Sequence, residues 1–338
     1  MESVESFLRQ LPKAELHLHF EGTILPATLV ELSQRPGHHP VTQAKVEALY
    51  RYKDFLGFLK AFGAVCEQLI EPEDYELAAW RMCEHLAAQG VVHAECFISV
   101  GVILRFRTDG EAVFPVIFAA LERARLRAES ELGLTLYWIF DAVRHFSVEE
   151  GAIVFRTAAR MRSQYPSIIG IGLGGDEKHT SSEPYAALYA EARAAGLRLT
   201  NHAGETTGPE AIHEALTVGS ERLGHAYSAI QDADLMEELK RLQIGLEMNP
   251  TSNVRTGVCP SFEAHPLRRC YEAGLLVTLN SDDPAFFGSD LLGEYEKAHR
   301  LQGFTRDELK QLARNSFRAS FLPETEKARW QARIDSIE

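Results

Sequence analysis

Short apolar runs recur along the chain, and a stretch with apolar residues at helical spacing follows each of them. Three of the helical stretches end at Gly196, Gly219 and Gly274, as expected for the residue that follows a helix C-terminus. Eight strand-then-helix units on one chain predict an α/β fold, a (β/α)8 TIM-type barrel. The predicted strands are 14–20, 91–98, 134–143, 168–175, 197–204, 221–227, 244–250 and 275–284.

One segment, residues 24–88, breaks the regular spacing between the first two predicted strands. It contains "RPGHHP" and the aromatic stretch "LYRYKDFLGFLKAFG", and its pattern predicts helices. We expect this insertion to lie over the barrel mouth, where a lid would be useful. No low-complexity linker divides the chain, so residues 1–338 are expected to form a single domain. An open doubly wound sheet is the alternative, although no GxGxxG motif opens the first unit.

Composition and charge narrow the range of partners. Hydrophobic residues make up 45% of the chain and charged residues 25%, which is ordinary for a soluble globular protein. The formal net charge is -13, and no run of Lys or Arg is long enough to follow a phosphate backbone. Nucleic acid is therefore not expected as a partner, whereas a small neutral substrate is compatible with this charge.

The cysteines and the first residues of the chain predict the compartment in which the protein works. The cysteines are odd in number and scattered, without a CxxC pair, which predicts reduced thiols. The first residues carry acids in place of the apolar part of a signal peptide, and no apolar run reaches the roughly 20 residues of a membrane helix. We expect a cytoplasmic protein without a membrane partner, and a homodimer is one alternative for its oligomeric state. The cysteines are Cys66, Cys83, Cys96, Cys259 and Cys270.

Polar side chains follow four of the predicted strands at the point where each strand ends. Because the active sites of such barrels lie at the carboxyl ends of the strands, we expect these side chains to meet. The polar strand ends are His17, His19 and Glu21 on the first strand, His202 and Glu205 on the fifth, His225 on the sixth, and Asp282 and Asp283 on the eighth.

This set of residue types predicts a hydrolytic metal site. Three imidazoles and one carboxylate form an N₃O shell for one Zn²⁺ per chain, with a coordination position left for water. The expected metal ligands are His17, His19, His202 and Asp282. His225 is then free to orient or deprotonate the water, and Asp283 to hydrogen-bond the attacking hydroxide. Glu205 is placed to hand a proton to the substrate.

Each of these residues also has an ordinary structural interpretation. A single strand histidine is most often structural, an HxH pair alone is a weak metal signal, and a DD pair before proline often caps a helix. A structural explanation would, however, need a separate coincidence at each strand end. A non-catalytic binding protein on the same fold is a further alternative, and its mark would be a lost ligand or acid. The glycine-rich loop 172–177, "GLGGDE", is equally a tight turn or a place where backbone approaches a ligand.

The motifs "PKAELHLHFEGT", "NHAGE", "RLGHAY", "NPTSNVRTG" and "VTLNSDDPAFFG" resemble, in order and spacing, those of the adenosine deaminase family of the amidohydrolase superfamily. The resemblance covers residues 11–320 and implies a zinc-containing barrel that removes the 6-amino group of a purine as ammonia. It implies the same metal ligands as above. It also implies that Glu205 protonates purine N1, that His225 and Asp283 hold and activate the water, and that the backbone of Gly175 contacts purine N3.

Departures from the family pattern concern the substrate. Glu21 stands where adenosine-specific members carry an Asp associated with the ribose 5′-hydroxyl, and "NSDDPAFFG" is closer to adenine deaminases. The segments "HAECFISVGVILRF" and "YWIFDAVRHF" resemble the branch that deaminates aminodeoxyfutalosine in the alternative menaquinone pathway. Its substrate carries a carboxyphenyl ketone at the 5′ end, which a nearby arginine would bind: Arg144, or else Arg105 or Arg107. We therefore expect aminodeoxyfutalosine first, adenosine second and adenine third.

Overall fold

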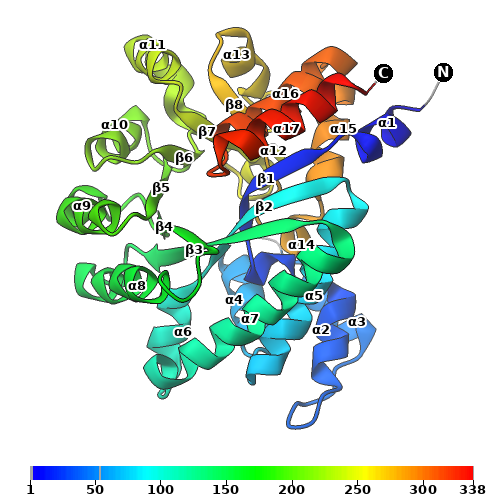
Figure 1. Cartoon of the computed structure of the whole chain (residues 1–338), viewed down its shortest axis with the longest axis vertical. Coiled ribbons are helices and arrows are strands. Elements are labelled where there is room, and N and C mark those ends of the chain that lie inside the picture. The colour runs from blue at the N-terminus through cyan, green and yellow to red at the C-terminus, as the bar shows by residue number, and fades with distance from the viewer. Residues whose placement is uncertain (1–2, 53–54, 338) are drawn as a thin grey trace.

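Eight parallel strands, paired in chain order, form the centre of the computed structural model, which describes residues 3–52 and 55–337 (Figure 1). Each lies within or overlaps one of the predicted strand ranges, so the predicted α/β barrel is confirmed. The strands are β1 (Lys13–His19), β2 (Val91–Ile98), β3 (Thr135–Val143), β4 (Ile168–Gly174), β5 (Arg198–Ala203), β6 (Arg222–His225), β7 (Gly245–Met248) and β8 (Leu276–Leu279).

The seam between β8 and β1 shows that the sheet closes. His19 N donates to Asp282 O over 3.0 Å, and Asp282 N donates to His17 O over 3.1 Å. Beside these bonds, the side-chain oxygen of Asn280 accepts from Leu16 N (2.9 Å) and from His17 N (3.2 Å). A side chain thus replaces part of the backbone ladder, and the alternative of an open doubly wound sheet is excluded.

Helices surround the barrel on its outer side, and the 23-residue helix α7 runs diagonally through the lower part of Figure 1. The helices are α1 (Val4–Gln10), α2 (Pro26–Ser33), α3 (Gln43–Leu49), α4 (Phe55–Cys66), α5 (Pro72–Ala88), α6 (Val100–Phe106), α7 (Gly110–Leu132), α8 (Val148–Met161), α9 (Ala186–Ala194), α10 (Pro209–Thr217), α11 (Ala233–Leu242), α12 (Pro250–Arg255), α13 (Leu267–Glu272), α14 (Pro284–Phe287), α15 (Leu291–Gln302), α16 (Arg306–Ala319) and α17 (Glu324–Asp335), with short 3-10 turns η1 (Glu21–Thr23), η2 (Glu183–Tyr185) and η3 (Tyr227–Gln231).

The insertion between β1 and β2 is helical, as predicted, and consists of α2 to α5, which Figure 1 shows together in blue. It packs against α14, directly after Asp283. The Tyr50 and Phe286 rings are stacked with centroids 4.8 Å apart, the Phe58 ring lies 5.5 Å from that of Phe286, and Tyr52 donates its hydroxyl to Phe286 O over 2.9 Å. These contacts tie the insertion to the end of β8, and its action as a lid stays a prediction.

A buried ion cluster occupies the barrel interior below the strand ends. Arg222 on β6 donates to the carboxylates of Glu95 on β2 and Glu247 on β7, and all three side chains are inaccessible to solvent. Its guanidinium also donates to Leu16 O (3.3 Å) and to Ala319 O (3.3 Å). Burial by itself would raise the pKa of Glu95, but Arg222 and His93 outweigh it and lower that pKa to about 2. Arg222 thus bridges two buried carboxylates, which also have histidine partners, His93 for Glu95 and His17 for Glu247.

Removal of that arginine should be costly. Arg222→Ala removes the guanidinium between two buried carboxylates, and we expect it to lower the free energy of unfolding by about 3–5 kcal/mol. The matched control is Arg156→Ala, which breaks the exposed pair with Glu191 and should leave stability nearly unchanged. Denaturant unfolding of both variants checks the expectation, and similar midpoints for the two would contradict it.

Along residues 3–52 and 55–337, no helix combines the length and the apolar character that a membrane span needs. The cysteines in this part of the chain are free thiols.

Candidate metal centre and active site

Four histidines and one aspartate meet at the carboxyl ends of the strands. His17 and His19 come from β1, His202 from β5 and His225 from β6, and the His17 ring centroid lies 5.3, 4.6 and 5.0 Å from those of His19, His202 and His225. Asp282, which follows β8, places Oδ1 3.5 Å from His17 Nε2 and 3.4 Å from His19 Nε2. The structure therefore brings the four expected metal ligands into one cluster.

The donor atoms of this cluster suit a divalent metal. The ligand atoms of His17, His19 and His202 lie within 4.8 Å of one another, and so do those of His17, His225 and Asp282. His17 Nε2 is buried without a hydrogen-bond partner, and His19 Nε2 faces His202 Nε2 at 3.2 Å. A cation between these nitrogens would satisfy all of them at once. Imidazole nitrogens with one carboxylate oxygen are a donor set that zinc favours.

Burial and two carboxylates set the protonation of the imidazoles. Burial lowers the pKa of His19 to about 4 and lowers that of His202 well below its usual value, so both rings are neutral, as metal ligation requires. Burial acts in the same direction on His17, but Asp282 and Glu247 outweigh it and raise the pKa of that ring to about 10. A metal ion must therefore displace a proton from His17, and metal affinity should fall as the pH is lowered.

Two further side chains orient the expected ligands. Glu247 on β7 lies with Oε2 2.6 Å from His17 Nδ1, which turns Nε2 of that ring toward the cluster. Ser252 at the start of α12 donates its hydroxyl to Asp282 Oδ2 over 2.6 Å. Sequence reasoning missed both residues. A charged residue inside the apolar run "IGLEMNP" was the available signal for Glu247.

The backbone of the site is strained at two of these positions. His225 has φ 61° and Asp282 has φ 66°, which is the left-handed region that non-glycine residues seldom adopt. Such strain persists only where the surroundings hold it, and it clusters at functional sites. For Asp282 the surroundings are the two backbone hydrogen bonds to β1 described above.

His225 lies between the metal cluster and Glu205. Its Nε2 is 3.8 Å from Asp282 Oδ2 and 3.7 Å from Glu205 Oε2. Its Nδ1 lies 3.1 Å from Asn253 Nδ2, and because an amide nitrogen donates, Nδ1 is the acceptor and Nε2 carries the proton. Burial lowers the pKa of His225 to about 3, so the ring is neutral. This arrangement favours orienting a water molecule over removing its proton.

Glu205 follows β5 and is the acid nearest to His225. Its side chain is 20% exposed, which leaves it reachable from the barrel mouth. Burial, followed by the charge of Asp282, raises the pKa of Glu205 to about 8. The carboxyl group is therefore largely protonated at pH 7 and suits proton donation.

Gly22 follows Glu21 in the sequence and packs directly against Asp283. A Cβ atom at Gly22 would fall 2.0 Å from Asp283 Oδ1 and 2.7 Å from Asp283 Cα, so only glycine allows this approach. Burial and the neighbouring Asp282 raise the pKa of Asp283. Glu21 is buried and accepts hydrogen bonds from Ser99 N (3.1 Å) and Ser99 Oγ (3.2 Å), which direct its carboxylate to the end of β2.

Gly22→Ala tests this contact. The added methyl group must displace Asp283, and we expect turnover to fall by roughly 10²-fold, the cost of a misplaced reacting group. Stability should fall by about 1–3 kcal/mol because the site is overpacked. Gly63→Ala in α4 is the control, because a Cβ there meets nothing within 4 Å. Steady-state assays with denaturant unfolding check both variants, and unchanged turnover in Gly22→Ala would contradict the expectation.

The remaining substrate-binding candidates are Gly175 and Arg144. Gly175 has φ 97° and a Cβ there would fall 2.8 Å from His145 Nδ1, so the turn after β4 requires glycine. Arg144 is buried in the barrel wall and donates to His202 O (2.6 Å), Asn201 Oδ1 (2.9 Å) and Leu173 O (3.3 Å). Its guanidinium is thus used within the protein, which gives no support to a contact with a substrate carboxylate.

The two other arginines are also engaged. Arg105 pairs with Glu150, and Arg107 donates to Ile70 O over 2.6 Å. Neither is among the contacts of the histidine cluster.

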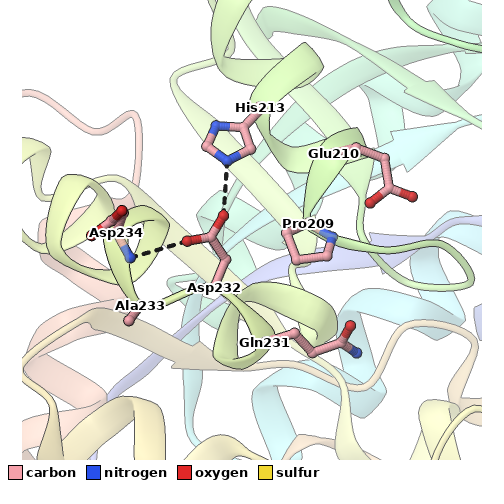
Figure 2. Close-up of a pocket in the computed structure, with 7 residues that line it drawn as sticks. All are labelled: Pro209, Glu210, His213, Gln231, Asp232, Ala233 and Asp234. Atoms are coloured by element: carbon pink, nitrogen blue, oxygen red, sulfur yellow. Dashed lines mark hydrogen bonds and ion pairs between the residues drawn. The ribbon is translucent and has the colours of Figure 1, made fainter.

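A surface pocket of about 560 Å³ lies elsewhere, on the outer face of the barrel where α10 and α11 begin (Figure 2). In it His213 Nε2 pairs with Asp232 Oδ2 at 3.2 Å, and Asp232 also accepts from the backbone at the start of α11. These contacts are structural, and none of the cluster residues lines the pocket. It is lined by Pro209, Glu210, His213, Gln231, Asp232, Ala233 and Asp234.

Comparison with known proteins agrees with this geometry. The family model described as adenosine deaminase matches residues 12–337. The aminodeoxyfutalosine deaminase of Streptomyces avermitilis is 38% identical over 339 residues, which cover 98% of this chain and 93% of the relative. The adenine deaminase of Rhodospirillum rubrum is 35% identical over 336 residues, which cover 98% of each protein.

Solved structures of an adenine deaminase and of an amidohydrolase have the same fold as this chain. An adenine deaminase from Arthrobacter aurescens is 29% identical and matches with a TM-score of 0.86 over 96% of this chain and 98% of that chain. An amidohydrolase from Burkholderia ambifaria, solved with bound Zn, is 26% identical and matches with a TM-score of 0.88 over 99% of this chain and 93% of that chain.

Proposed function

Since this chain belongs to the adenosine deaminase family and is a hydrolytic deaminase of aminopurines, we propose that it is a zinc enzyme that removes the 6-amino group of an adenine nucleoside as ammonia. One observation carries the proposal: His17, His19, His202 and Asp282 converge at the strand ends beside Glu205, whose pKa burial raises to about 8. A metal-binding donor set next to a neutral acid is what hydrolysis at a ring amidine needs.

Within the proposal, one zinc ion per chain is held by the three imidazoles and by Asp282. When bound, the metal lowers the pKa of water and so supplies hydroxide at neutral pH. Glu205 donates its proton to purine N1, which withdraws electrons from C6 and makes that carbon electrophilic. His225 and Asp283 orient the attacking water at the face of the ring, and the backbone of Gly175 meets purine N3.

Aminodeoxyfutalosine is the proposed substrate. Two relatives named aminodeoxyfutalosine deaminase, from Streptomyces avermitilis and Streptomyces coelicolor, are 38% and 36% identical to this chain. Glu21 supports a departure from adenosine, because its carboxylate is bound to Ser99 at the end of β2. Adenosine is the second candidate.

Adenine is the third candidate, and a specific observation favours keeping it. Relatives named adenine deaminase are 33–36% identical over nearly the whole chain, which is only slightly below the two Streptomyces proteins. Arg144, Arg105 and Arg107 all contact protein groups, whereas adenine has no 5′-carboxylate that needs an arginine.

A substrate panel tests the proposal. Zinc-loaded protein is incubated with adenine, adenosine, 5′-deoxy-5′-methylthioadenosine and aminodeoxyfutalosine, and loss of the 6-aminopurine chromophore is followed in the ultraviolet. We expect the highest kcat/KM with aminodeoxyfutalosine. A higher value with adenine or adenosine would replace the substrate assignment, and no ammonia release from any of the four would contradict the deaminase proposal itself.

A further inference from the structure

A buried carboxylate outside the metal cluster holds the loop that carries Glu205. Glu177, in the loop between β4 and η2, is only 8% exposed. Its Oε1 accepts a hydrogen bond from Gly204 N at 2.7 Å, and its Oε2 accepts from Glu205 N at 3.0 Å and from Thr206 N at 2.8 Å. The Thr206 hydroxyl also donates to Oε2 over 3.3 Å. Three consecutive backbone N–H groups therefore converge on one side chain.

This convergence leaves the loop little freedom. Bonds from neutral N–H groups to an ionised acceptor are stronger than those between neutral groups. Gly204 has φ 70°, and a Cβ atom there would fall 2.5 Å from Ser228 Oγ and 2.7 Å from Ile212 Cδ1. The turn is thus bound by Glu177 and packed against Ile212 and Ser228, which restricts the backbone next to Glu205.

A second buried side chain holds the same segment just before Glu205. Arg144 donates to His202 O at 2.6 Å and to Thr180 O at 3.4 Å, the latter in the same loop as Glu177. The backbone at the metal ligand His202 and at the acid Glu205 is therefore held by two side chains, Arg144 and Glu177. Holding the backbone in this way does not require Arg144 or Glu177 to touch a substrate.

We propose that Glu177 is a positioning residue, which fixes the backbone of residues 204–206 and thereby aims the carboxyl group of Glu205 at the substrate ring. The inference rests on the proposed function, in which Glu205 is the proton donor. A carboxylate is required because it accepts at both oxygens. A glutamine side chain has one accepting oxygen, and its NH₂ group would face backbone donors.

Two variants and one control separate positioning from general stability. In Glu177→Gln one or two of the three N–H groups lose their acceptor. Glu177→Asp keeps the charge but is one methylene shorter, so it cannot span all three. Glu122→Gln is the control, because Glu122 is an equally buried carboxylate that accepts from Trp138 Nε1 at 3.0 Å and Ser167 Oγ at 2.7 Å, away from the site.

Hydrogen exchange and kinetics are the readouts. In both Glu177 variants we expect faster amide exchange at residues 204–206 and a kcat lower by roughly 10²-fold, the cost of a displacement of about 1 Å. KM for the best panel substrate and the bound zinc should change little. Glu122→Gln should lower thermal stability while it leaves kcat and the exchange of residues 204–206 unchanged. Wild-type kcat or wild-type exchange in Glu177→Gln and Glu177→Asp would overturn the proposal.

A double-mutant cycle with Glu205→Gln completes the test. If Glu177 acts through Glu205, Glu177→Gln should cause no further loss of kcat in the Glu205→Gln background. A loss of the same factor in both backgrounds would overturn the proposal, because it would show an effect independent of Glu205. Full turnover in Glu205→Gln alone would instead refute the proton-donor role, while the exchange data would still report on the contact between Glu177 and the loop.

Discussion

Replacing His17 with alanine is expected to remove the bound metal and to lower turnover by at least about 10³-fold. Metal catalysis contributes several kcal/mol to transition-state stabilisation, and each 1.36 kcal/mol corresponds to tenfold in rate. His17 lies at the centre of the cluster, since it belongs to both groups of residues with close donor atoms. Its loss also leaves Glu247 Oε2 without the partner at 2.6 Å that it has on the ring. Only three of the four proposed ligands then remain, and the central one is missing, so we expect the site to lose its zinc during purification.

Metal analysis of the purified protein, with kcat measured on the same sample, checks this expectation. Asp282→Ala should behave in the same way. His225→Ala is the matched control, because this buried imidazole is assigned to the water and not to the metal. It should lower turnover while the zinc content stays near one per chain. Stoichiometric zinc in both His17→Ala and Asp282→Ala would refute the proposed ligand set.

Glu247 contacts the ligand His17, so a change at Glu247 should weaken metal binding less than the loss of a ligand does. Carboxylates that hold a ligating histidine typically contribute 10–100-fold to metal affinity. The same carboxylate is bound by Arg222, so the metal site and the barrel interior share one ion cluster. Loss of Arg222 would disturb Glu247 and, through it, His17. We therefore expect an Arg222 variant to bind metal more weakly as well as to be less stable.

The fold could be predicted because buried parallel strands are short apolar runs with helices between them. The strand limits could not be predicted as well, and the reasons are local. The run 221–227 ends as a strand at His225 because Ala226 adopts φ 48°. The run 275–284 ends at Leu279 because the Asn280 side chain then bonds the backbone of β1.

The candidate site could be predicted where chemistry requires a particular residue type at a strand end, as for His17, His202 and Asp282. The residues that hold those side chains could not, because their role depends on contacts between distant elements. Glu15 is an example: it is buried on β1 and accepts from Ser281 N at 3.0 Å and from Ser281 Oγ at 2.5 Å, directly before Asp282. Nothing in the sequence near either residue indicates this contact.

Arg144 shows that a residue named from a motif can have structural contacts that its sequence position does not reveal. An arginine beside a motif is easily assigned to an anionic substrate. In the structure Arg144 serves the backbone of β5, and the same strand end is held from the other side by Glu177. Buried charged side chains thus fix the backbone at His202 and Glu205, the proposed metal ligand and proton donor.

Glu205→Gln is expected to lower kcat by about 10²–10⁴-fold, the usual contribution of a positioned general acid. Glutamine is similar in size, so the fold, the zinc content and the contacts of Glu177 with the loop should persist. The loss would then report on the proton alone. Steady-state kinetics with the best panel substrate and metal analysis check the variant, and full turnover with normal zinc would count against the proton-donor role.

The pH dependence of the unmodified enzyme provides the second half of this test. Burial and Asp282 raise the pKa of Glu205 to about 8, so the carboxyl group is protonated at pH 7 and ionises as the pH rises through that value. An ionised Glu205 has no proton to give, and kcat/KM should therefore fall on the alkaline side. A bound dication would favour the ionised form, which places the descending limb at or below about pH 8. Glu205→Gln should lack this limb, because an amide does not titrate in that range. An identical alkaline limb in the variant would assign it to another group and leave Glu205 without a role in proton transfer.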